Sequence, residues 1–144
     1  MSSKPTFRCK NEAQKQAIRA SYARRNANKP KKEDINYYNQ DGRHFRGHRD
    51  YVNGSVVYHP NYIVGEKDDY YASFGITNEK KYDKKHNNIL LKVNPKNGDS
   101  GDVYIHKDLT IDKKQKYTSI YYGYTISEED EQYLNKRIEK WTKK

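Results

Sequence analysis

Histidine, threonine and lysine side chains gather around two predicted strand ends in this sequence. His59 directly precedes Pro60 between two strand-like stretches, and Thr77 ends the strongest such stretch, residues 70–76. A basic loop follows, with Lys80, Lys81, Lys84, Lys85 and His86. A histidine can act as general acid or base while Lys or Thr holds a phosphate, so this grouping fits phosphodiester cleavage without a metal. The alternative is a structural histidine, a strand-ending threonine and a solvated charged loop.

A metal site is not expected. His44 and His48 are four residues apart, the spacing of two ligands on a helix, but Gly47 intervenes and no carboxylate or Cys cluster joins them. The sequence also lacks the P-loop, the dinucleotide-binding glycine motif, the nucleophile elbow and the HExxH zinc motif. These enzyme classes are therefore disfavoured, and we expect neither a metal nor a cofactor.

Cysteine content and hydropathy predict a cytoplasmic location. Cys9 is the single cysteine, so no intramolecular disulfide can form, which fits a reducing compartment. No apolar run approaches the roughly 18 residues needed to span a membrane. The first residues have no apolar core of a signal peptide.

Positive charge is concentrated in the first third of the chain. The net charge is +10, and residues 1–50 contribute 13 Lys/Arg against 5 Asp/Glu, whereas residues 51–144 contribute 16 against 14. Such an arm favours a polyanionic partner, because neutralised phosphates release their counterions. The alternative is a solubilising surface without a ligand. The candidate nucleic-acid-binding residues are Lys15, Arg19, Arg24, Arg25, Lys31, Lys32, Arg43, Arg46, Arg49, Lys80, Lys81, Lys84 and Lys85.

Tyrosines must supply much of the core. Only 33% of residues are apolar, the mean hydropathy is −1.35, and 15 of the 19 aromatic residues are Tyr. A buried Tyr must bring its hydroxyl to water or to a partner, which favours a thin sheet or small barrel. Exposed Tyr rings between basic residues would also stack with the bases of single-stranded RNA, although paired Tyr residues are expected in any Tyr-rich sheet.

The N-terminal part, residues 1–50, is predicted to be a basic arm. Asn11 is a helix N-cap and Pro30 stops the helix, which gives a polar helix over about 11–28. Residues 30–50 are polar and contain two glycines, so we expect a linker or a loosely docked segment there.

Residues 51–144 are predicted to form the ordered domain. Asn53-Gly54 and Lys67-Asp68-Asp69 signal turns, Pro60 should end a strand, and short strands are expected over 56–58, 62–64, 70–76, 89–93, 103–105, 109–111 and 119–122. Ser127 caps a final helix whose residues Leu134, Ile138 and Trp141 share one face. This order predicts an α+β fold with a small, strongly curved antiparallel sheet or barrel between a basic N-terminal helix and a C-terminal helix.

Three short motifs resemble the PemK/MazF-like toxin family. They are residues 59–64 (HPNYIV), 75–78 (GITN) and 108–113 (DLTIDK), followed by Gly123 and the Ser-Glu-Glu-Asp opening of the final helix. The resemblance covers about residues 57–141. It implies a small SH3-like barrel and, for many members, a metal-independent endoribonuclease of a toxin–antitoxin module.

The resemblance carries two residues over as a candidate catalytic pair, His59 and Thr77. The family usually has an Arg directly before the matching Pro, where this chain has His59. A histidine can transfer a proton but lacks the fixed charge and the bidentate fork of Arg. We therefore expect an RNA-directed nucleic-acid-binding protein, toxin-like and with an antitoxin or other protein partner, that is a candidate endoribonuclease. The alternative is a non-catalytic phage or mobile-element protein that binds nucleic acid or a nucleic-acid-dependent machine.

Overall fold

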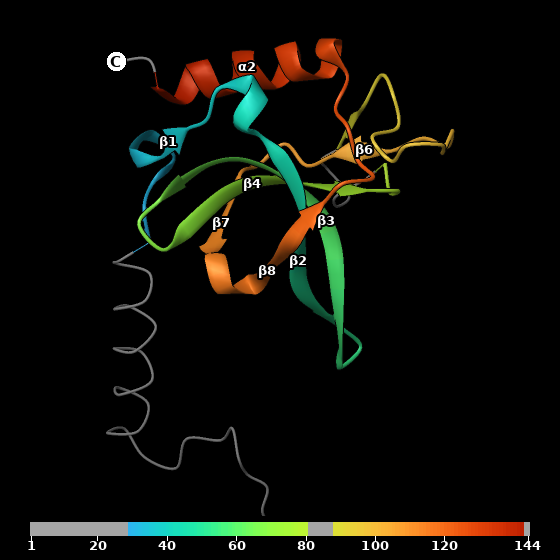
Figure 1. Ribbon diagram of the computed structural model, residues 1–144, viewed down its shortest axis with the longest axis horizontal. Helices are drawn as coiled ribbons and strands as arrows, with labels where there is room; N and C mark the ends of the chain where they lie inside the picture. The colour runs from blue at the N-terminus through green and yellow to red at the C-terminus, as the bar shows by residue number, and fades with distance from the viewer. Residues whose placement is uncertain (1–28, 81–87, 143–144) are drawn as a thin grey trace, which may run out of the picture.

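The computed structural model describes residues 29–80 and 88–142, which form eight strands, three 3-10 helices and one α-helix (Figure 1). The strands are β1 (Asn36–Tyr37), β2 (His44–Val52), β3 (Ser55–Lys67), β4 (Tyr70–Thr77), β5 (Ile89–Leu90), β6 (Tyr104–Ile105), β7 (Thr110–Lys113) and β8 (Tyr117–Tyr121). The helices are η1 (Lys32–Asp34), η2 (Gln40–Gly42), η3 (Lys114–Lys116) and α2 (Glu128–Thr142). The helix predicted over 11–28 lies outside the described residues.

The strands form one antiparallel sheet that curls strongly. Its order is β5-β6-β4-β3-β2-β8, with β7 beside β4 and β1 beside β3. Strand β7 pairs with β4 and β8 pairs with β2, yet only η3 separates β7 from β8 in the chain. The sheet must therefore bend until its two sides approach one another. In the described part of the chain no ladder joins β7 to β8, so the sheet is not closed. A mostly antiparallel sheet with one C-terminal helix agrees with the predicted α+β class.

Both predicted turns between the long strands are confirmed. Asn53 and Gly54 have φ values of 51° and 81° and connect β2 to β3, whose last pair is Val52 with Ser55. Positive φ at both central residues is the requirement of a type I′ hairpin turn. Asp68, with a φ of 52°, lies in the turn between β3 and β4.

The predicted linker over residues 30–50 is wrong. Strand β2 pairs with β3 along its whole length and with β8 on its other side. The proposed boundary near residue 51 would thus separate β2 from β3, its partner in the hairpin. Polar residues such as Arg46 and His48 made this segment look exposed in the sequence. In the structure both faces of β2 are covered, one by the core beneath α2 and the other by β7 and β8.

The expectation that Pro60 ends a strand is also wrong, because this residue lies within the 13-residue β3. It pairs with Gly47, whose amide donates to Thr118 Oγ1 on the β8 side at 2.8 Å. The Gly47 amide thus points away from β3, and in such a pair the backbone nitrogen of the partner points the opposite way. The Pro60 nitrogen therefore faces the β4 side. Pairing between β3 and β4 ends at Asn61, and the missing proline N–H removes no ladder hydrogen bond.

The C-terminal helix forms as predicted and covers one face of the sheet (Figure 1). The Asp130 amide donates to Ser127 Oγ at 3.2 Å, which confirms the N-cap. Leu134 and Ile138 are buried in the core, and the Trp141 ring stacks on Phe74 at 5.9 Å between centroids. No helix in the described residues has the length and apolar character required to cross a membrane.

The central strands separate apolar from polar side chains. Tyr62, Val64 and Phe74 belong to the core beneath α2. Their neighbours Asn61 and Ser73 point to the opposite face, where they are equally buried. The concave face covered by β7 and β8 therefore holds buried polar residues beside the buried Ile63, and this face leads to the candidate site.

Candidate functional site

His59, within β3, and Thr77, the last residue of β4, line one cavity. Asn61 pairs with Gly75, so continuing the antiparallel alignment by two residues sets His59 opposite Thr77. The cavity has a volume of about 400 Å³. Its lining residues come from the middle of β3, the end of β4 and the turn after it, and the segments before β6 and after β8: His59, Pro60, Ile76, Thr77, Asn78, Glu79, Asn94, Lys96, Asp99, Val103 and Tyr124.

His59 combines exposure with a nearby carboxylate. Its side chain is 51% exposed, and its Nε2 lies 3.9 Å from Asp50 Oδ2. The Asn61 side-chain amide donates to the His59 carbonyl at 3.1 Å and fixes the backbone there. An exposed imidazole beside a carboxylate that can orient it is what a general acid or base requires.

The Thr77 hydroxyl supports the turn after β4. Its Oγ1 accepts a hydrogen bond from the Glu79 amide at 3.1 Å. A hydroxyl can accept and donate at once, so this interaction is compatible with donation to a phosphate oxygen. Lys80 is exposed just beyond this turn, and Lys96 lines the cavity with its Nζ 3.8 Å from Asp99.

A buried hydrogen-bond network holds the strands behind the cavity. Ser73 Oγ donates to Asn61 Oδ1 at 2.9 Å and lies 3.0 Å from the Tyr117 hydroxyl. Burial raises the pKa of Tyr117, so its hydroxyl stays protonated. This network ties β3, β4 and β8 together and fixes the strand that carries His59.

His48 lies between two carboxylates and extends this polar face. Its Nε2 is 2.8 Å from Asp112 Oδ2, and its Nδ1 is 3.3 Å from Asp50 Oδ1. Each ring nitrogen of His48 therefore lies close to a carboxylate oxygen, one from β2 and one from β7. Burial raises the pKa of Asp112, but hydrogen bonds from His48 and the Lys113 amide outweigh it and hold the pKa below its ordinary value. Sequence reasoning missed this group, because β2 and β7 do not pair with each other and only the curl of the sheet brings them together.

His106 contributes a third imidazole near this face, after His59 and His48. Its Nδ1 lies 3.0 Å from Asn88 Oδ1, and its amide donates to the Gly75 carbonyl. Burial lowers the pKa of His106, and a charge on His59 lowers it further, although Asp108 and Asp50 act in the opposite direction. The neutral form of His106 is therefore favoured near pH 7.

Two of the predicted phosphate-binding arginines are engaged inside the protein. The Arg43 side chain is 6% exposed and forms an ion pair with Glu131, so its charge is already neutralised. Arg46 donates to His44 Nε2 at 2.9 Å and to the Thr118 carbonyl at 2.8 Å, and its guanidinium lies over the Tyr71 ring. Both side chains support the fold rather than present charge to a partner.

The other predicted phosphate-binding residues have varied positions. Lys31 and Lys80 are exposed, Arg49 is half-buried on β2, and Lys32 Nζ lies 4.8 Å from the centre of the Trp141 ring. Outside the described residues lie Lys15, Arg19, Arg24, Arg25, Lys81, Lys84 and Lys85.

Neither a cluster of metal ligands in the described residues nor a similarity to known proteins indicates a function. Among residues 29–80 and 88–142, no three His, Cys, Asp or Glu side chains gather as metal ligands would. No family model, curated protein or solved structure matches this chain. The functional interpretation therefore depends on the residues of the cavity and their chemistry.

Proposed function

We propose that this protein binds single-stranded RNA and cleaves it without a metal ion, with His59 as the acid–base residue. The observation that supports this best is the shared cavity of His59 and Thr77. Both residues are carried over as a catalytic pair by the sequence resemblance, and they line one cavity beside Lys96. Substrate RNA and a toxin-like role imply a cytoplasmic protein with an antitoxin-type partner.

The proposed reaction is an internal transfer within the RNA. His59 accepts the proton of a ribose 2′-OH, whose oxygen attacks the adjacent phosphorus while the bond to the 5′-oxygen breaks. The leaving 5′-oxygen takes up a proton from water, His59 releases the proton it accepted to solvent, and a 2′,3′-cyclic phosphate remains. Thr77 Oγ1 donates to a non-bridging phosphate oxygen, and Lys96 supplies positive charge for the transition state.

The curled sheet supports the SH3-like barrel implied by the resemblance. Strands β2, β3, β4 and β7 follow one another in the sheet, and η3 returns the chain to β8 beside β2. In this proposal the barrel remains open between β7 and β8.

A non-catalytic binding protein is the second candidate function. The cavity contains the carboxylates Glu79 and Asp99, and Lys96 is partly neutralised by Asp99. His59 also replaces the fixed charge that the family's arginine would supply. These features weaken transition-state stabilisation while leaving RNA binding by other basic residues unaffected.

Cleavage of a labelled single-stranded RNA, with and without EDTA, tests the proposal. We expect cleavage in both conditions and a loss of about 100-fold or more for His59→Ala, since general acid–base catalysis contributes on this scale. Thr77→Ala should also slow cleavage. Tyr58→Ala is the matched control, because Tyr58 is 49% exposed on the neighbouring position of β3 and points to the other face.

Two outcomes would contradict this proposal in different ways. RNA that stays intact in both conditions, but binds with an affinity that falls steeply with salt, would favour the non-catalytic alternative. RNA that neither binds nor breaks at low ionic strength would exclude both functions.

A further inference from the structure

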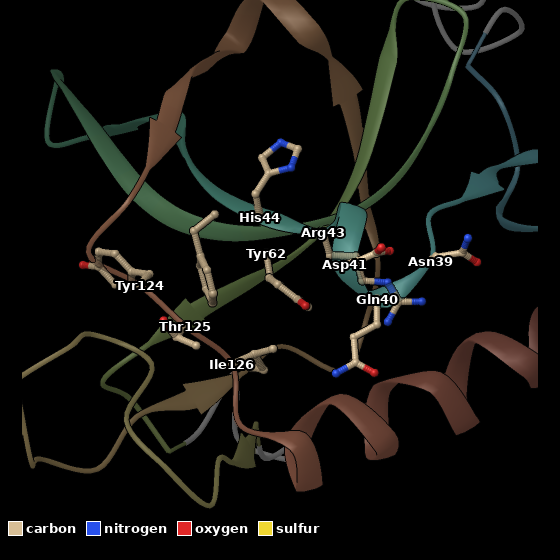
Figure 2. A pocket seen from close by; sticks show the side chains of 10 residues that line it. Asn39, Gln40, Asp41, Arg43, His44, Tyr62, Tyr124, Thr125 and Ile126 are labelled. Carbon is tan, nitrogen blue, oxygen red and sulfur yellow. The ribbon is translucent and has the colours of Figure 1, made fainter.

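A second cavity lies next to the first and has a different chemistry. Its volume is about 620 Å³, and it lies between η2 and residues 124–126 (Figure 2). Tyr124 lines both cavities, so a ligand in one is separated from a ligand in the other by this side chain. The two cavities are therefore placed to hold neighbouring parts of one extended molecule.

Aromatic rings form one wall of the second cavity. The Phe45 ring lies 4.8 Å from Tyr62 and 5.3 Å from Tyr124, between centroids. Tyr62 and Phe45 are buried, whereas Tyr124 is half-buried and can offer part of its ring to a ligand. Planar heterocycles bind on such rings by stacking, and a nucleobase gains about 1–3 kcal/mol in this way.

The charges around this cavity disfavour a phosphate. Arg43 is its single cation among the described lining residues, and it is paired with the buried Glu131 and bonded to Asn135 Oδ1 at 2.6 Å. Burial lowers the pKa of His44 and the charge of Arg46 lowers it further, although a bond to the Gly42 carbonyl acts the other way. Figure 2 also shows His44 projecting away from the other labelled side chains.

The rim carries groups that suit the edge of a nucleobase. Asn39 and Gln40 are exposed and line the cavity, and each carboxamide has both donors and an acceptor. Asp41 adds an acceptor, and Thr125 adds a hydroxyl. Figure 2 shows Tyr62 between the η2 residues and the segment Tyr124 to Ile126, so the polar rim and the aromatic wall enclose one space.

We propose that this second cavity binds one nucleobase of the RNA whose phosphodiester reaches His59. Tyr124 stacks on the base, and Gln40 and Asn39 read its polar edge. The inference rests on the proposed function and deepens it, because it makes this cavity the source of a base preference. Asp41 can only accept hydrogen bonds when ionised. Uracil offers a single donor, N3–H, between two carbonyl oxygens that a carboxylate repels, so a base with an exocyclic amino group is preferred over uracil.

Binding of four short homopolymeric RNAs, of A, C, G and U, tests the inference by fluorescence anisotropy. The measurement uses the full chain carrying His59→Ala, so that the RNA remains intact. We expect unequal affinities, with U weakest. Gln40→Ala should weaken binding of the preferred RNA by about three- to tenfold, the effect of one missing hydrogen bond. The difference in affinity among the four RNAs should therefore become smaller.

Gln115→Ala provides the matched control. Gln115 is an exposed glutamine in the three-residue η3, just as Gln40 is in η2, and it lies outside both cavities. Tyr124→Leu keeps an apolar side chain but removes the ring, and it should weaken all four RNAs. Because Gln40 is exposed, its substitution leaves the core intact.

The outcomes separate this inference from the proposed function. Four equal affinities, unchanged by Gln40→Ala, would overturn the base-binding cavity even if cleavage at His59 is established. If none of the four RNAs binds, the proposed function is overturned together with this inference. A preference that Gln115→Ala alters as much as Gln40→Ala would also overturn the inference.

Discussion

Glu131 is a fully buried carboxylate that holds three parts of the molecule together. It receives hydrogen bonds from the Arg43 guanidinium and the Tyr62 hydroxyl, and it lies in the first turn of α2. Burial raises the pKa of Tyr62, and the hydrogen bond to Glu131 raises it further. Tyr62 thus remains a donor, and the carboxylate fixes both partners, which line the second cavity.

Replacing Glu131 with Gln should strongly destabilise the protein. Arg43 would remain buried without a counter-charge, and removing one partner of a buried ion pair typically costs about 3–5 kcal/mol. Urea unfolding measures this change. Glu128→Gln is the control, since Glu128 is exposed in the same helical turn and shares the favourable helix-dipole position. Equal stability of the two variants would show that the buried pair contributes nothing specific.

At the residue scale, the sequence predicted the pair His59 and Thr77 but not their polar surroundings. Adjacent strands of one hairpin bring His59 and Thr77 together, and a hairpin can be recognised locally. His48 lies opposite His59 in the β2–β3 hairpin, but the expected linker over residues 30–50 hid this pairing. Asp112 lies on β7, which does not pair directly with β2, so no local pattern reveals its proximity to His48. Arg43 was misjudged for the same reason, because Glu131 is 88 residues away in the chain.

At the scale of elements, the turn residues and the helix cap were predictable from the sequence, but strand β2 was not. Asn53-Gly54 and the Ser127 cap depend on neighbouring residues, and both formed as expected. Strand β2 carries a buried Phe45 on one face and polar side chains such as His48 on the other. The alternation of hydrophobic and polar residues does not reveal the burial of both faces of β2, because the sheet curls over hydrogen-bonded polar side chains. A pattern that distinguishes only hydrophobic from polar residues predicts such side chains to be exposed.

Gly65 allows β1 to pair closely with β3. A Cβ added at this position would lie 2.7 Å from both the Asn36 carbonyl oxygen and Ile35 Cγ2, and 3.1 Å from the Tyr37 Cα. Backbone atoms of β1 cannot move aside without breaking the pairing of Tyr37 with Gly65. The segment before η2 therefore depends on this glycine.

Gly65→Ala should destabilise the protein by about 2 kcal/mol, the range of overpacking in a tight interior. The denaturation midpoint in urea measures the effect. In Gly123→Ala the added methyl group meets no atom within 4 Å, so this control should leave the midpoint nearly unchanged. A Gly65→Ala midpoint equal to that of the control would mean that β1 contributes little to stability.

At the scale of the whole molecule, charge and fold are separated along the chain. Residues 1–28 hold seven Lys/Arg and one Glu, a net charge of +6 out of +10. All the strands described above begin after residue 35. A truncation at residue 28 therefore removes charge without removing a strand of the sheet, whereas a truncation at residue 50 removes β1 and most of β2.

Deleting residues 1–28 should weaken RNA binding and make it less sensitive to salt, while the sheet stays folded. Each phosphate neutralised on a single strand adds about −0.7 to the slope of log Kobs against log salt concentration. Anisotropy at several salt concentrations measures this slope. For every phosphate contact that the deletion removes, the slope should become shallower by about 0.7. A full-length variant with the seven Lys/Arg replaced by Gln separates charge from chain length, and it should match the truncation. If both variants keep the original slope, the phosphates bind to the folded domain, where Lys31 and Lys80 are the first residues to substitute.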